Sequence, residues 1–343
     1  FKLNPANPDN RYIFLIFKSI TLSGGWNETF SAQTGFSVAD AQDIGVIGYI
    51  AARDANGNRV AAQIERFILQ NSNPGPNYAG ALYVDGDLVL NNSTVRYNRA
   101  GGCGGLCVYG SIDLNNVTMQ YNSAVNDGGA IAIGQGARAT IRNSTIVRNQ
   151  AGGRGGGILA QTGAMVNLQN TILAENTAGV SGADCSGPVV SSGYNLVGAT
   201  AGCAMTPGPG DLNGANARLL PTAYWLGYFA LGPDSPAIDS GNPTGCIDAQ
   251  GNPLAADQRN APRYGRCDIG AYEYRPPGPA AQITTARGSW QSATVSSLFQ
   301  EPLVAGVTDA LGTPLAEGTA VTFQAPAFGA SGVFTDTNSA ATV

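Results

Sequence analysis

An asparagine recurs at intervals of 24 to 27 residues in the first half of the chain, and this repeat constrains the fold more than any other feature of the sequence. The residue three positions before each of these asparagines is always apolar. Self-similarity at such a period is typical of a solenoid, in which each repeat buries its apolar face against its neighbours. The asparagines are Asn71, Asn98, Asn122, Asn149 and Asn176, and the apolar residues before them are Ile68, Val95, Met119, Ile146 and Leu173.

Each repeat carries the pattern of three short strands. From the second repeat on, another asparagine stands six residues before the first, and apolar residues alternate with mixed ones ahead of it, which is the period of a half-buried strand. Three strands without a helical pattern predict a right-handed parallel β-helix with three strands per coil. A leucine-rich repeat, the nearest alternative, requires a helix or a strict leucine spacing. The second asparagine column is Asn92, Asn116, Asn143 and Asn170.

The two asparagine columns allow a structural and a functional interpretation. Asparagines could bind ligands or accept glycans, because several of them begin Asn-x-Ser/Thr triplets. Stacked asparagines can instead hydrogen-bond to one another and to turn backbone, which satisfies buried polar groups at every coil. We expect structural ladders in both columns. The triplets begin at Asn27, Asn91, Asn92, Asn116 and Asn143.

Motifs within the repeat and after it resemble two bacterial groups. Gly128-Gly129-Ala130-Ile131, followed by Ile146-x-x-Asn149, resembles the repeats of polymorphic outer-membrane-type β-helix adhesins. Three later motifs resemble the closing module of the bacterial β-helix surface proteins called choice-of-anchor Q, and residues 21–27 resemble their first coil. The resemblance covers most of residues 20–274, departs at 36–60, and implies a cell-surface location more than an activity. The later motifs are 235–239, 257–263 and 267–273.

An open β-helix exposes unpaired strand edges at both ends and needs caps. The aromatic residues Tyr224, Trp225, Tyr228 and Phe229 are expected to plug the core in the C-terminal cap. The expected division is an N-terminal cap with the first coils at 1–48, β-helix repeats at 49–205, a C-terminal capping module at 206–275, a linker at 276–280, and a partial Ig-like β-sandwich at 281–343.

The last segment resembles an invasin-type bacterial Ig-like domain. Residues 303–307 and 320–323 flank a Gly312-Thr313-Pro314 turn, as the two strands of a hairpin would. Its 63 residues fall short of the roughly 100 of a complete sandwich. Either the chain is truncated, or a neighbouring copy supplies a strand and forms a head-to-tail filament.

Six cysteines occur as three local pairs, although 15 connectivities are possible. An even number of paired cysteines indicates an oxidising compartment, and therefore an extracellular or cell-surface location. The disulfide candidates are Cys103 with Cys107, Cys185 with Cys203, and Cys246 with Cys267.

The chain contains no histidine, which removes imidazole acid–base chemistry, Ser-His-Asp triads and histidine metal sites. Carboxylate and arginine chemistry remains, and β-helix polysaccharide lyases use it with bound calcium. No carboxylates cluster in the repeats, so no metal or cofactor is expected. The one dense charged set lies in the closing module, where ion pairs holding irregular chain are favoured over catalysis. It comprises Asp239, Asp257, Arg259, Arg263, Arg266, Asp268 and Glu273.

The remaining signals bear on partners. The net charge is −5 and the basic residues are scattered, which argues against nucleic acid. The longest apolar run has six residues, too few to span a membrane. Tyr83, Tyr97, Tyr109 and Tyr121 could form an outward strip that stacks on sugars, or pack across coils. We expect a non-catalytic structural or adhesive surface protein whose partners are copies of itself or surface carbohydrate; a polysaccharide-binding protein, lyase or hydrolase is the alternative.

Overall fold

The computed structural model describes residues 12–75, 79–220, 226–248, 250–287, 291, 293–294, 297–315, 319–325 and 340–342. These residues form two compact units. The first comprises residues up to Pro221 together with Gly227–Tyr274, and the second comprises Thr222–Leu226 and the residues from Arg275 onward.

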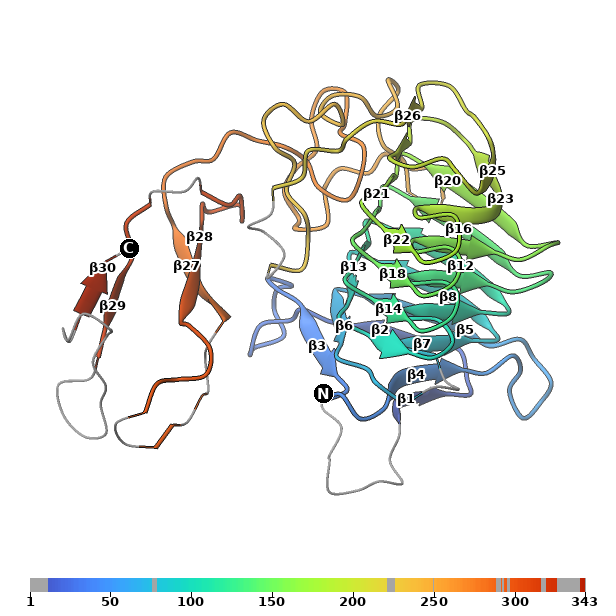
Figure 1. Ribbon diagram of the computed structural model, residues 1–343, viewed down its shortest axis with the longest axis horizontal. Coiled ribbons are helices and arrows are strands. Elements are labelled where there is room, and N and C mark those ends of the chain that lie inside the picture. The colour runs from blue at the N-terminus through green and yellow to red at the C-terminus, as the bar shows by residue number, and fades with distance from the viewer. Residues whose placement is uncertain are drawn as a thin grey trace. The chain divides into compact units, whose positions relative to one another are not determined.

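The first unit is a right-handed parallel β-helix, as the sequence predicts (Figure 1). Its strands stack in three sheets, because each strand pairs in parallel with its counterpart one coil further on. Among the described residues, six coils carry all three strands. Coil 1 holds β1 to β3, coil 2 holds β4 to β6, coil 3 holds β7 to β9, coil 4 holds β11 to β13, coil 5 holds β15 to β17 and coil 6 holds β19 to β21.

Sheets 1 and 2 hold the first two strands of each coil. After coil 6 both sheets continue into one longer strand, β23 (Cys185–Ser191), which pairs with β19 of sheet 1 and β20 of sheet 2. Sheet 1 consists of β1 (Tyr12–Ile16), β4 (Val46–Ile50), β7 (Leu82–Val84), β11 (Leu106–Val108), β15 (Ile131–Ile133) and β19 (Ile158–Ala160). Sheet 2 consists of β2 (Ile20–Ser23), β5 (Ala61–Glu65), β8 (Asp87–Asn91), β12 (Ser111–Asn115), β16 (Arg138–Arg142) and β20 (Met165–Gln169), and β25 (Cys203–Thr206) pairs with β23.

Sheet 3 closes each coil, and a short sheet 4 of two-residue strands follows it. Sheet 3 consists of β3 (Ser37–Asp40), β6 (Phe67–Gln70), β9 (Thr94–Arg96), β13 (Thr118–Gln120), β17 (Thr145–Val147), β21 (Ile172–Ala174), β24 (Leu196–Val197) and β26 (Leu212–Asn213). Sheet 4 consists of β10 (Arg99–Ala100), β14 (Ser123–Ala124), β18 (Gln150–Ala151) and β22 (Thr177–Ala178).

The core is a stack of aliphatic side chains along the coil axis. The inward column of sheet 2 runs through Leu90, Leu114, Ile141 and Leu168, all fully buried. Residues alternate inward and outward along these strands, as a period of two requires. The repeated apolar residues thus supply one continuous core through the six coils.

One register expectation is wrong. β6 pairs with β9 so that Leu69 lies opposite Val95, and the inward residue of that strand is therefore Leu69 and not Ile68. Asn71 consequently aligns with Tyr97, and Ser72 takes the position equivalent to Asn98. Because two adjacent residues of β6 are apolar, the alternation that defines the register is ambiguous in the sequence at this point.

The corner between sheets 2 and 3 explains the second asparagine column, Asn92 to Asn170. Asn92, Asn116, Asn143 and Asn170 have φ angles of 47°, 55°, 47° and 51°. Asparagine is among the few residues other than glycine that adopt this left-handed conformation readily. One such residue per coil turns the chain sharply from one sheet to the next.

The C-terminal capping module was expected to plug the end of the core, and this is wrong for most of it. Residues 203–213 still form strands of the last coils. Residues 227–274, called the closing segment below, lie along the outer face of sheet 3, where their backbone and side chains bond to coils 3 to 6 (Figure 1). Tyr228 and Phe229 belong to this flank, whereas Tyr224 and Trp225 lie outside the described residues.

The second unit contains two antiparallel strand pairs. β27 (Gln282–Arg287) pairs with β28 (Val304–Thr308), and β29 (Thr322–Gln324) pairs with β30 (Ala340–Thr342). The expected hairpin between 303–307 and 320–323 is therefore wrong. The turn exists, since Asp309 N–H donates to the Thr313 carbonyl, and beside it the described residues form the Thr308–Pro314 bridge and a bond from Leu315 N–H to the Val307 carbonyl.

Candidate functional site

The first asparagine column, which contains Asn98, Asn122, Asn149 and Asn176, forms a hydrogen-bond ladder inside the β-helix. In Asn98, Asn122 and Asn149, both the backbone N–H and Nδ2 donate to Oδ1 of the next asparagine, at 2.9 to 3.2 Å. Asn176 donates in the same way to the carboxylate of Asp184. The ladder therefore has a direction, and it ends on a group that only accepts.

Asp184 is the buried terminus of this ladder. Burial raises the pKa of its carboxyl group, although hydrogen bonds from Asn176 and from the Ala199 N–H oppose the shift. Asn71, which the sequence places in this column, is outside it: its Nδ2 donates to both carboxylate oxygens of Asp40, each at 3.2 Å. Ser72 takes the position in the ladder, and its backbone N–H donates to Asn98 Oδ1.

The corner column binds the closing segment. Nδ2 of Asn116, Asn143 and Asn170 donates to the carbonyls of Ala256, Ile247 and Asp268, respectively, at 2.8 to 3.0 Å. The expected ladder is interrupted in this column.

Asn116 donates to Asn92, and Asn170 donates to Asn143. Asn143 does not continue the ladder to Asn116, because Arg263 Nη2 already donates to Asn116 Oδ1 at 3.1 Å. Asn143 donates to Asn115 instead.

Threonines two positions after three of these asparagines also bind the closing segment. Thr94, Thr118 and Thr145 point outward from sheet 3 yet are at most 1% exposed. Gln258 accepts from Thr118 Oγ1 and donates to Thr94 Oγ1 and the Ser93 carbonyl, and Ala271 N–H donates to Thr145. The Asn-x-Thr triplets are thus buried docking positions, and Asn116 and Asn143 are each only 1% exposed.

The charged set of the closing segment forms a buried network. The Asp257 side chain is 0% exposed and pairs with Arg259, whose guanidinium lies 3.7 Å from the centre of the Tyr272 ring. The Glu273 side chain is 2% exposed and pairs with Arg263 at 3.0 Å. Each of these carboxylates also accepts backbone N–H groups, so their lone pairs are used within the fold.

The rest of that set divides between the network and the surface. Asp268 is buried and accepts the N–H groups of Asp239 and Tyr274. Arg266 is exposed and donates to the carbonyls of Ser240 and Gly241. Asp239 contributes its backbone N–H to the network, whereas its side chain is exposed.

Two neighbouring carboxyl groups in this network have raised pKa values. Burial and the nearby charge of Glu273 raise the pKa of Asp268 to about 7, against hydrogen bonds from Tyr274 and Asp239. Burial also raises the pKa of Glu273, which Arg263 opposes. Because these groups are closed to solvent and bonded to backbone, the shifts reflect the packing of the closing segment.

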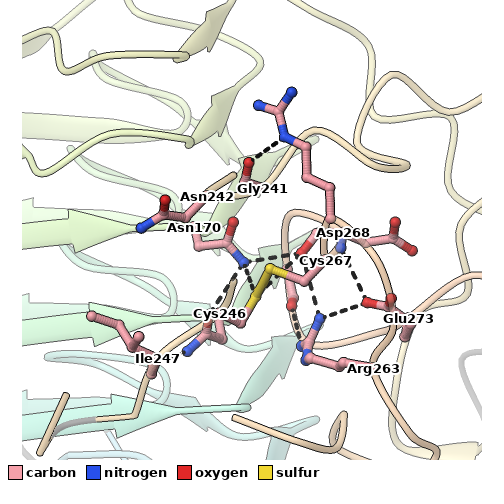
Figure 2. Close-up of a disulfide and its surroundings, with 12 residues drawn as sticks. Asn170, Gly241, Asn242, Cys246, Ile247, Arg263, Cys267, Asp268 and Glu273 are labelled. Atoms are coloured by element: carbon pink, nitrogen blue, oxygen red, sulfur yellow. Dashed lines mark hydrogen bonds and ion pairs between the residues drawn. A yellow bond between two sulfur atoms is a disulfide. The ribbon is translucent and has the colours of Figure 1, made fainter. Parts of the chain in front are cut away.

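All three expected disulfides are present: Cys103–Cys107, Cys185–Cys203 and Cys246–Cys267. Figure 2 shows that Cys246–Cys267 joins two parts of the closing segment beside Asn170, whose Nδ2 approaches Cys246 Sγ at 3.0 Å. This disulfide therefore holds the bonded parts of the closing segment at coil 6.

The four tyrosines expected in one strip belong to two separate stacks. Tyr83 and Tyr109 stack with ring centres 5.1 Å apart, and Tyr97 and Tyr121 with centres 5.4 Å apart. Gly134 lies against the other side of Tyr109, since an added Cβ there would fall 2.8 Å from the ring. Stacking of Tyr109 on Tyr83 favours packing across coils over stacking on sugars, although Tyr109 is 54% exposed.

Sequence reasoning missed a hollow on the outer face of sheet 1. It measures about 220 Å³ and lies over Cys107 and Ala132, which are small residues in a column that also holds Tyr83 and Leu159. The only sequence signal is this fall in residue size across two coils. Asn126, Asp127 and Gln161 lie around it.

Comparison with known proteins agrees with this architecture. A family model described as a right handed beta helix region matches residues 31–211. The chain belongs to the right-handed β-helix family. No curated protein and no solved structure matches it. Over the described residues, the β-helix protein has no group of three His, Cys, Asp or Glu side chains placed to hold a metal ion, and no helix long and apolar enough to cross a membrane.

Proposed function

We propose that this β-helix protein is a non-catalytic, extracellular structural and adhesive surface protein. The observation that carries this proposal is the state of its densest charged set. Asp257 and Glu273, two carboxylates of this set, are 0% and 2% exposed and are bonded to arginine and backbone. A glycosidase needs two carboxylates beside an open groove.

The motifs shared with choice-of-anchor Q and outer-membrane-type β-helix proteins support a surface location, as do three disulfides. Rigid stacked coils suit a rod that carries other modules away from a cell. The second unit is then a partial Ig-like spacer, and a strand from a neighbouring copy completes it in a head-to-tail filament.

Two measurements test this function. Incubation with a panel of polysaccharides is expected to give no new reducing ends and no unsaturated products, and clear turnover would overturn the non-catalytic role. Antibody labelling of intact cells is expected to detect the protein at the surface. Light scattering at rising concentration tests the filament separately, because a chain that stays monomeric contradicts it.

A saccharide-acting enzyme or saccharide-binding protein is the second candidate function. The open hollow on sheet 1 favours binding, because it combines an apolar floor with polar side chains. Its one carboxylate, Asp127, is paired with Arg154 at 2.8 Å, which does not favour acid–base chemistry there.

A further inference from the structure

We propose that the hollow over Cys107 and Ala132 on sheet 1 binds one neutral sugar ring of a surface glycan. This inference rests on the proposed adhesive function and names the chemical class of its target. The volume of about 220 Å³ is below the roughly 300 to 1,000 Å³ typical of sites for drug-sized ligands, so the hollow admits a single ring.

The floor of the hollow is apolar and fixed in place. The Cys103–Cys107 disulfide and Ala132 form it, and both cysteines are at most 5% exposed. The disulfide ties the glycine-rich turn before β11 to the strand itself, so the floor forms without rearrangement on binding. A pyranose ring has an apolar face of C–H groups that matches such a floor.

The rim of the hollow is polar, with Asn126 and Gln161 among its residues. Asn126 and Gln161 are exposed, and neither amide side chain hydrogen-bonds to another described residue. These amides can donate to and accept from hydroxyl groups. A wholly apolar ligand would cover them without replacing their bonds to water, which costs binding energy.

The charges at the rim favour a neutral ligand. Asp127 accepts from the Arg154 backbone N–H at 2.6 Å and from its Nη2 at 2.8 Å. Although burial raises the pKa of Asp127, these bonds outweigh it and lower the pKa overall. Since the carboxylate is ionised and already paired, the rim has no uncompensated charge to attract an ionic ligand.

Tyrosine stacking limits how the sugar can bind. Tyr83 and Tyr109 each use one ring face on the other, and Gly134 lies against one side of the Tyr109 ring. The saccharide therefore rests on the disulfide and Ala132 rather than on an aromatic face.

The test is saturation-transfer NMR and calorimetry on the full chain with disulfides intact, using hexasaccharides of glucose, galactose, mannose and N-acetylglucosamine as probes. At least one probe is expected to bind with a Kd of about 1 mM or tighter. Ala132→Phe, which fills the hollow, should weaken binding at least tenfold, and Asn126→Ala with Gln161→Ala severalfold. Ala61→Phe, on the exposed face of sheet 2, is the matched control and should leave binding unchanged.

Two results would overturn the inference: no binding of any probe at 10 mM by the wild-type chain, a ceiling set at about ten times the expected Kd, or binding that survives Ala132→Phe in a chain with unchanged circular dichroism. The proposed surface function is judged separately, by cell labelling and by the absence of turnover. A protein at the cell surface that binds none of these saccharides would refute only the glycan site.

Discussion

Replacing Asn149 with alanine tests the ladder most directly. Its side chain makes four full hydrogen bonds: the two N–H groups of Nδ2 are shared among the Met119 and Val147 carbonyls and Asn176 Oδ1, and Oδ1 accepts both the backbone N–H and Nδ2 of Asn122. At about 1 kcal/mol net for each bond, with the Asn122 N–H left buried and unpaired, Asn149→Ala should lower the free energy of unfolding by about 4 to 6 kcal/mol.

Asn71→Gly is the matched control, because the sequence places Asn71 in the same column and the structure places it outside. Among the described residues the Asn71 side chain bonds to Asp40 alone, and glycine retains the φ angle of 57° without strain. The expected loss is about 1 kcal/mol or less. Urea unfolding followed by circular dichroism measures both variants, and equal losses would refute the assigned ladder.

Three further predictions concern the closing segment. Gln258→Ala removes the bond from Thr118 Oγ1 and one of the bonds at Thr94 Oγ1 and at the Ser93 carbonyl, all buried, so it should cost about 2 to 4 kcal/mol. It should also make residues 227–274 easier to cleave by protease, and unchanged cleavage would contradict this docking. Replacing Cys246 and Cys267 with serine opens a loop of 21 residues and should cost about 3 kcal/mol in denaturant midpoint experiments, whereas a loss near zero would mean the segment is held without the disulfide. The folded pKa of Asp268 is about 7, above its unfolded value of 3.8, so the folded state binds the proton more tightly. The free energy of unfolding should therefore rise as pH falls from 8 toward 4, by at most about 4 kcal/mol from this group. Asp268→Asn should flatten that part of the pH profile.

The coil architecture could be predicted from sequence because each inward position repeats locally. Leu90, Leu114, Ile141 and Leu168 recur at one coil position, and each pairs with its neighbours in the predicted register. The predicted register is wrong at Asn71 because Ile68 and Leu69 are both apolar, and the alternation alone does not say which of them points inward. Local alternation therefore predicts the fold but leaves single registers open.

The closing segment could not be placed from sequence, because its contacts join residues far apart along the chain. Gln258 reaches Thr94 across 164 residues, and nothing near either residue indicates the pairing. In the sequence, Thr94, Thr118 and Thr145 have the pattern of outward residues in contact with solvent, whereas in the structure the closing segment buries them. The recurrence of Asn-x-Thr at the coil period is the available signal in the sequence, but it equally fits an asparagine ladder or a glycan acceptor.

The docking of the closing segment also bears on the length of the rod. A solenoid whose coils contact only their neighbours can gain or lose a coil with little effect elsewhere. Here Asn116, Asn143 and Asn170, from three successive coils, each bind a different point of one segment that a disulfide holds together. An extra coil inserted among them would shift one partner by about 4.8 Å and break its hydrogen bond. The closing segment therefore fixes the number of coils between Asn116 and Asn170. We expect insertion or deletion of a whole repeat to be tolerated in coils 1 and 2, which lie outside that span.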